Sequence, residues 1–223
     1  MKHELSPIDD QPASAKAGFI STAPLPARPK ASRQEISVEL TRKSIHLLIA
    51  FVPLINSISH ILAISLLTAG IIAYSIFEYL RMHGVKVPII SALTERAARP
   101  RDSGKYVKGP ITLGLGALLA VLVFSPSVAA ISVYVLAFGD GLSSLAGKIF
   151  GRSRLPFSTC KSIEGSIVCF AFSFLGTYAV CRKPLESLLI ALMATVVEAI
   201  PTQDWDNIIL PLFTGTMAFL LGL

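Results

Sequence analysis

Residues 137–152 contain the side chains whose types and spacing point most directly to chemistry. An apolar run reaches Asp140, and Ser144, Gly147 and Gly151 follow it at spacings of 4, 3 and 4. On a continuous helix these four residues share one face. The carboxylate could bind Mg²⁺, and the glycines would let phosphate oxygens approach the backbone. The alternative for the glycines alone is a helix-packing stripe, but an ionisable group ending an apolar span is a functional candidate.

Basic residues stand close to this carboxylate. Lys148 lies inside the same stretch, and Arg152 and Arg154 follow it. Such cations could neutralise the charge of a polyphosphate next to a metal ion. We therefore interpret Asp140, Ser144, Gly147, Lys148 and Gly151 as parts of a nucleotide site.

A second set of polar residues precedes the first long apolar run. Glu39, Arg42, Lys43 and His46 lie at positions i, i+3, i+4 and i+7, on one face of a helix that would enter the membrane. Basic residues at such a helix end can simply be interfacial anchors. His46 lies one turn deeper, where its ring needs a partner. We expect Arg42 and Lys43 to contact phosphate, and His46 to orient a phosphate or an acceptor hydroxyl.

Two further basic segments border apolar runs. Lys105 and Lys108 lead to a glycine and a proline that could start a helix, and they could bind phosphate or form an interfacial flank. Lys161 precedes another span, where a helix N-terminus favours anions. Glu164 could cap that helix, or it could be a second metal ligand beside Asp140.

Carboxylates also follow the sixth apolar run. Glu198 lies near the end of that run, so it should pair with a cation or act as a base. Asp206 and Asn207 could cap the last helix, or they could bind metal or nucleotide. Trp205 is most simply an interfacial anchor.

The elements that position these residues are membrane helices. The chain has 223 residues, of which 52% are hydrophobic and 15% charged, and its mean hydropathy is +0.65. This composition excludes a soluble domain and indicates an all-α, polytopic membrane bundle. The net charge of +6 lies mainly in loops, so it suggests anionic ligands and a membrane orientation, with no nucleic acid as partner. The three cysteines suggest no metal site.

The apolar runs predict about seven transmembrane helices, with six and a re-entrant segment as an alternative. Residues 1–35 are polar and rich in proline, which predicts a disordered cytoplasmic tail before a membrane domain at 36–223. Pro53 and residues 56–60 mark the first expected turn. Lys and Arg gather on one side of this topology, which places the N-terminus and the candidate site in the cytoplasm. The expected spans are two within 44–80, then 110–124, 128 onward, 162–180, 185–200 and 208–223.

In these residues the chain resembles the polyprenol kinase family, which includes dolichol, phytol and farnesol kinases and a CTP-dependent diacylglycerol kinase. The resemblance runs from about residue 36 to the C-terminus, and the motifs follow the family's order. The matching residues are Arg42-Lys43 with His46, the stretch 140–152, the stretch 161–166, Glu198, and Asp206-Asn207.

The resemblance implies a membrane kinase that transfers the γ-phosphate of CTP to a lipid alcohol with a divalent metal. It implies that Asp140, Gly147, Lys161 and Glu164 form the nucleotide site, and that Arg42 and Lys43 are needed for activity.

Our hypothesis is that Mg²⁺ is held by Asp140 and Glu164, with Asp206 as a further ligand, and that His46 or Glu198 accepts the proton of the alcohol. The substrate would be a polyprenol, phytol, farnesol or diacylglycerol. The membrane would be a bacterial or archaeal plasma membrane, or the endoplasmic reticulum. The alternatives are a cytidylyltransferase that makes a CDP-lipid and a small non-enzymatic membrane transporter.

Overall fold

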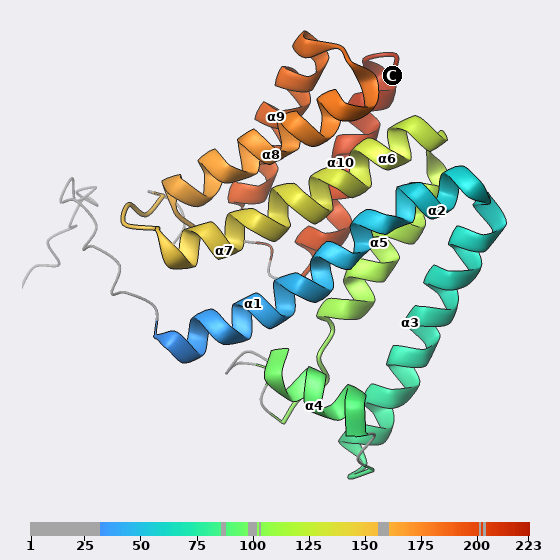
Figure 1. Ribbon diagram of the computed structural model, residues 1–223, viewed down its shortest axis with the longest axis vertical. Coiled ribbons are helices and arrows are strands. Elements are labelled where there is room, and N and C mark those ends of the chain that lie inside the picture. The colour runs from blue at the N-terminus through green and yellow to red at the C-terminus, as the bar shows by residue number, and fades with distance from the viewer. Residues whose placement is uncertain are drawn as a thin grey trace, which may run out of the picture.

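The computed structural model describes residues 32–85, 88–97, 102, 104–155, 161–200, 202 and 204–223, and its regular elements are all helices (Figure 1). The all-α expectation is confirmed. The helices are α1 (Arg33–Leu47), α2 (Val52–Ile58), α3 (His60–Met82), α4 (Pro88–Ala97), α5 (Gly109–Val123), α6 (Pro126–Tyr134), α7 (Gly141–Ile149), α8 (Ile163–Cys181), α9 (Pro184–Ala199) and α10 (Asp206–Leu220), with a 3₁₀ segment η1 (Leu48–Phe51) and a π-helical segment η3 (Val135–Asp140).

The centre of the bundle is the rod formed by α6, η3 and α7. One side of it packs against α9 and α10, where Val128, Ile131 and Val135 meet Ile190 and Leu210. Its other side faces a second apolar cluster, to which α2, α3 and α5 contribute. In Figure 1 the α1–α2 rod runs beside the central rod, and α3 lies at the edge of the molecule. The central rod is therefore the element against which the others are positioned.

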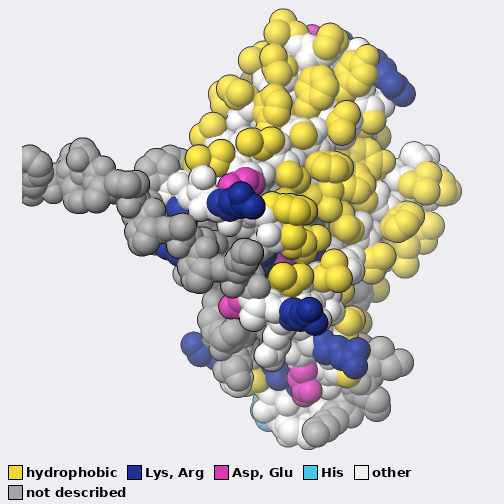
Figure 2. All heavy atoms as spheres, turned by 60° about the vertical axis from the view of Figure 1, so that its left-hand side comes forward, with side chains coloured by type: hydrophobic (Ala, Val, Ile, Leu, Met, Phe, Trp, Pro, Cys, Tyr) yellow, Lys and Arg dark blue, Asp and Glu magenta, His cyan; other side chains and the backbone are white. Residues whose placement is uncertain are grey.

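Within the part of the chain that the structure describes, three helices are long and apolar enough to cross a membrane: α3, the rod Pro126–Ile149, and α8. Two shorter apolar helices, α5 and α10, accompany them. Hydrophobic side chains cover the upper part of the surface in Figure 2, while most charged side chains in that view lie lower. This separation fits a membrane-embedded bundle with a polar face. The seven spans and the cytoplasmic N-terminus stay predictions.

The start of α1 and the first turn differ in detail from the expectation. Ser32 caps α1 in a reciprocal pair of hydrogen bonds with Glu35, so 33–35, which we assigned to the tail, are helical. The rest of the expected tail lies outside the described residues. Pro53 does not mark a turn, because it occupies the first turn of α2, where its missing N–H is tolerated. The chain turns at Ser59, whose backbone is extended.

A buried ion pair that the sequence did not suggest fixes the segment before α5. Glu78 on α3 is fully buried and accepts two hydrogen bonds from the Arg81 guanidinium, at 2.7 and 2.8 Å. Glu78 Oε1 also accepts from the Val107 backbone N–H at 2.7 Å, and Arg81 donates to the Lys105 carbonyl at 2.9 Å. The pair therefore ties residues 105–107 to α3.

Replacing Glu78 should destabilise the protein in detergent. In Glu78→Gln an amide N–H₂ would face the Arg81 guanidinium, so the buried network would lose about 1–3 kcal/mol of stability. We expect a lower Tm by scanning fluorimetry. The matched control is Glu186→Gln in the first turn of α9, which should leave Tm almost unchanged. Equal Tm values for the two variants would show that the buried Glu78–Arg81 pair does not contribute to stability.

Candidate active site

One cavity of about 650 Å³ collects most of the residues that the sequence singled out. Its charged end lies where α1, α7, α9 and the starts of α8 and α10 meet. Its other end is lined mostly by apolar side chains of α3, α4 and α5, with Tyr74 and Thr94 as polar members. The charged end contains Glu39, Arg42, Lys43, His46, Asp140, Lys148, Lys161, Glu198, Asp204 and Asp206.

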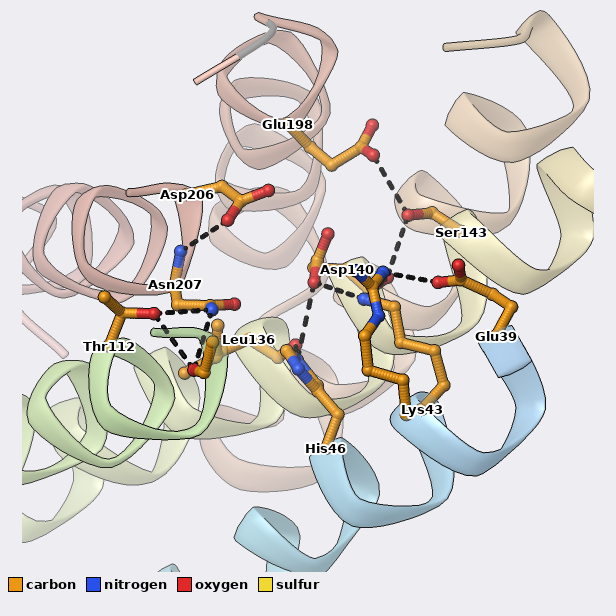
Figure 3. Close-up of polar contacts among 12 residues, drawn as sticks. Glu39, Lys43, His46, Thr112, Leu136, Asp140, Ser143, Glu198, Asp206 and Asn207 are labelled. Carbon is orange, nitrogen blue, oxygen red and sulfur yellow. Dashed lines mark hydrogen bonds and ion pairs between the residues drawn. The ribbon is translucent and has the colours of Figure 1, made fainter. Parts of the chain in front are cut away.

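Asp140 is the last residue of η3, and it is buried at the centre of this end (Figure 3). The Lys43 ammonium donates to Asp140 Oδ2 at 2.7 Å and to its backbone carbonyl at 3.2 Å. His46 Nε2 donates to the Leu136 carbonyl at 2.9 Å and lies 3.4 Å from the same carboxylate oxygen. Side chains of α1 thus bind the carbonyls of the π-helical segment, and π-helical turns are frequent at functional sites.

Glu198 lies at the end of α9, and it is buried beside Asp140. It pairs with the Lys161 ammonium, as the sequence predicted for a carboxylate at this depth. The Ser143 hydroxyl lies 3.1 Å from Glu198 Oε1 and 3.1 Å from the Asp140 carbonyl (Figure 3). Burial lowers the pKa of Lys161, but Glu198 and Asp140 outweigh this effect and raise that pKa above its ordinary value. Lys161 therefore stays cationic at neutral pH.

Glu39 connects α1 to the end of α7. Its side chain is 1% exposed, one oxygen pairs with Arg42, and the other lies 2.6 Å from the Lys148 ammonium. Burial raises the pKa of Glu39, but Arg42, Lys43 and Lys148 outweigh burial and hold that pKa below its ordinary value. Arg42 and Lys148, which we expected to bind phosphate, are therefore both paired with the Glu39 carboxylate.

The structure brings some of the other predicted residues to the cavity. Ser144 and Gly147 line it. Gly151 lies past the end of α7 and packs so closely that an added Cβ would stand 2.2 Å from the Gly147 carbonyl oxygen and 2.8 Å from Ser162 Oγ. Its lack of a side chain is therefore explained by packing.

Gly151 does not line the cavity, and three further predicted residues also lie elsewhere. Lys105 and Lys108 are exposed and do not line the cavity. Glu164 does not line it either, because its Oε1 accepts from the backbone N–H groups of Arg152 and Ser153 at 2.9 and 3.2 Å. Glu164 therefore fixes the loop after α7, and the structure does not bring it beside Asp140.

The carboxylates of the cavity could hold a magnesium ion together with phosphate. Within the described ranges, no group of three or more His, Cys, Asp and Glu forms a metal cage. Mg²⁺ does not need one, since it is usually bound by one or two carboxylates and the phosphates of the substrate. Asp140 and Asp206 both line the cavity (Figure 3). Asn207 donates to Thr112 Oγ1 at 3.0 Å, which anchors the start of α10 on α5.

The site also contains residues that the sequence reasoning missed. Ser143 was quoted only as part of a motif, although it joins Glu198 to Asp140. Asp102 and the apolar residues of α3 and α4 were not assigned to the site, but they line the cavity. Ser143 lies three residues after Asp140, which was a usable signal. The apolar residues gave none, because any span contains such side chains.

Comparison with known proteins supports the resemblance. The chain is 35% identical over 158 residues to a protein named probable phytol kinase 1, chloroplastic, from Oryza sativa, covering 62% of this chain and 50% of that protein. It is 28% identical to phytol kinase 1 of Arabidopsis thaliana, covering 77% of this chain and 56% of the relative. The farnesol kinase of that plant is 28% identical, covering 56% and 46%.

These relatives confirm the resemblance to phytol and farnesol kinases. The chain spans about half the length of the first curated relatives that it matches. No family model matches the chain. No solved structure matches it.

The lowered pKa of Glu39 predicts a pH-dependent contribution to stability. This contribution is fully present above the ordinary pKa of 4.5 and is lost as the pH falls through the lower pKa of the folded protein. Glu39→Gln should therefore lower the free energy of unfolding at pH 7 by about 1–3 kcal/mol, which is measured as a lower Tm. The difference in Tm between this variant and the native protein should become smaller in acid. Glu35→Gln, which keeps a side chain suited to the capping box, is the control. A deficit that does not depend on pH would contradict the prediction.

Proposed function

We propose that this protein is a lipid-alcohol kinase that transfers the γ-phosphate of CTP to a hydroxyl at the membrane surface. The observation that carries the proposal is that a single cavity has a charged end and an apolar end. A phosphate donor fits the first end and a hydrocarbon chain fits the second. The names of the similar plant proteins support phytol, farnesol or a related isoprenoid alcohol as the acceptor. CTP as donor rests on the family resemblance.

The charge of the cavity supports a requirement for a divalent metal. The lining contains six carboxylates, but the Lys and Arg side chains among the described lining residues number four. A nucleoside triphosphate would add more negative charge to this excess. Mg²⁺ held by Asp140 and Asp206 would supply the missing positive charge and neutralise the transferred phosphoryl group. Arg42, Lys43, Lys148 and Lys161 would contact the remaining phosphate oxygens.

The chemical step would join the alcohol oxygen to the γ-phosphorus. The bond from that phosphorus to the bridging oxygen breaks, CDP leaves, and a carboxylate accepts the hydroxyl proton. Glu198 suits this role better than His46, because the His46 nitrogen next to Asp140, Nε2, already carries a proton that it donates to the Leu136 carbonyl. The lipid would reach the site from the membrane, with the charged end facing the cytoplasm and 36–223 acting as the kinase domain.

Replacing Asp140 should abolish phosphate transfer. We expect Asp140→Asn to lose at least about 10²–10³-fold in kcat, the loss typical of removing one preorganised electrostatic group. The measurement is transfer of label from γ-labelled CTP or ATP to phytol, farnesol, dolichol or diacylglycerol, with and without Mg²⁺. Glu186→Gln is the control and should keep full activity.

The same assay separates the kinase from a cytidylyltransferase. A kinase releases CDP and labels the lipid, whereas a cytidylyltransferase releases pyrophosphate and forms a CDP-lipid. Full activity of Asp140→Asn would refute the proposed metal site. If folded protein forms neither product, a non-enzymatic membrane protein would be favoured.

The proton acceptor can be identified by comparing two variants. Glu198→Gln should lose about 10²–10⁴-fold in kcat, as expected for a general base. His46→Gln should lose much less, because an amide N–H₂ can still donate to the Leu136 carbonyl. The reverse pattern would identify His46 as the acceptor of the hydroxyl proton.

A further inference from the structure

The apolar end of the cavity continues along one face of α3. Gly70, Ala73, Tyr74 and Phe77 all line it, and they lie at positions i, i+3, i+4 and i+7. Seven residues of α-helix extend over about 10 Å. We name this part of the cavity, lined by these four residues, by Leu93 and Ala97 of α4 and by Leu113 of α5, the apolar arm.

The apolar arm reaches the surface of the molecule at Gly70. This glycine lines the cavity, yet it is exposed. It lies on α3, a candidate membrane span of which only 6% is buried inside the protein. An opening at this depth, ten residues after the start of α3, would face the hydrocarbon of the bilayer. Phe77, seven residues after Gly70 on the same face of α3, precedes the buried Glu78 that holds Val107.

The lack of a side chain at Gly70 keeps this opening wide. Apart from its two chain neighbours and the backbone of its own helix, no described atom lies within 4 Å of a Cβ added at this position. Packing against another helix therefore does not explain the glycine, in contrast to Gly114, where an added Cβ would stand 2.7 Å from Ile71. Glycine in a helix interior also costs about 1 kcal/mol relative to alanine. Gly70 therefore lines the apolar arm with open space at its Cβ position.

We propose that the apolar arm is the lateral entrance and binding site for the hydrocarbon chain of the acceptor alcohol, with Gly70 at its rim; this rests on the proposed kinase function. The chain would enter from the bilayer at Gly70 and place its hydroxyl at the charged end. Because the arm is short, it would contact the part of the chain near the hydroxyl and leave the rest in the membrane. Gly70 is then a residue that determines which chains can enter.

The test combines binding with activity in the full-length protein. A long isoprenoid alcohol carrying a diazirine near its hydroxyl is bound to the detergent-purified protein and photolysed, and the labelled peptides are mapped by mass spectrometry. Labelling that excess unmodified alcohol removes is counted as specific. The variants are Gly70→Phe, which places a bulky side chain where a Cβ meets no neighbouring helix, and Ala69→Phe. Ala69 is the matched control, because it is exposed on the same helix but does not line the cavity.

We expect specific label within residues 70–77 of the native protein, its loss in Gly70→Phe, and its retention in Ala69→Phe. For the long alcohol, kcat/KM should fall at least tenfold in Gly70→Phe, while a short alcohol that does not extend to the rim keeps most of its rate. Specific label elsewhere, no specific label, or equal effects of the two variants would overturn the proposal.

The binding readout is independent of the kinase assay. Specific label on α3 in a protein that transfers no phosphate would support the apolar arm as a lipid-binding site and refute the proposed kinase activity. Phosphate transfer with specific label on other helices would keep the kinase and refute the arm.

Discussion

The site depends on the buried ion pair between Lys43 and Asp140. The side chains of both residues are less than 5% exposed, and their charged atoms lie 2.7 Å apart. Removing two charges from water is costly, and replacing a buried ion pair with well-packed apolar residues is often neutral or stabilising. The pair fixes the position of α1 along the central rod, because it joins α1 to the π-helical turn of that rod. The proposed role of both residues in binding phosphate and metal would explain why the chain keeps a costly pair here.

Two further contacts follow from the same position of α1. His46 lies one turn beyond Lys43 and binds the Leu136 carbonyl, and Glu39 lies one turn before it and binds Lys148 on α7. The contacts extend along α1 at intervals of three or four residues, and each ends on the central rod. A shift of α1 by one residue would break all of them together. The charged end of the cavity is therefore as rigid as the packing of these two helices.

The sequence revealed this part of the site because its signals are local. The spacing of Glu39, Lys43 and His46 defines a helix face, and each of these charged or polar residues is conspicuous near an apolar run. Asp140 was equally visible.

Other features depend on tertiary contacts that spacing does not encode. Glu78 was overlooked because its partner Val107 is a backbone group 29 residues away. Glu164 was expected at the cavity, but the loop amides of Arg152 and Ser153 hold it instead. Gly70 looked like any small residue in a span, and only the space beside it distinguishes it.

The pairing of the cations also shapes how the site would bind phosphate. In the structure, Arg42, Lys43, Lys148 and Lys161 are each paired with a carboxylate. Phosphate binding is then an exchange of partners, and its free energy is the difference between two sets of ion pairs. Arg42 and Lys148 share the single carboxylate of Glu39, and their side chains are 24% and 25% exposed. They are easier to redirect than Lys43, which is buried and also binds the Asp140 carbonyl. Phosphate would therefore draw Arg42 and Lys148 away from Glu39, whereas Lys43 would contact phosphate while it remains bound to Asp140.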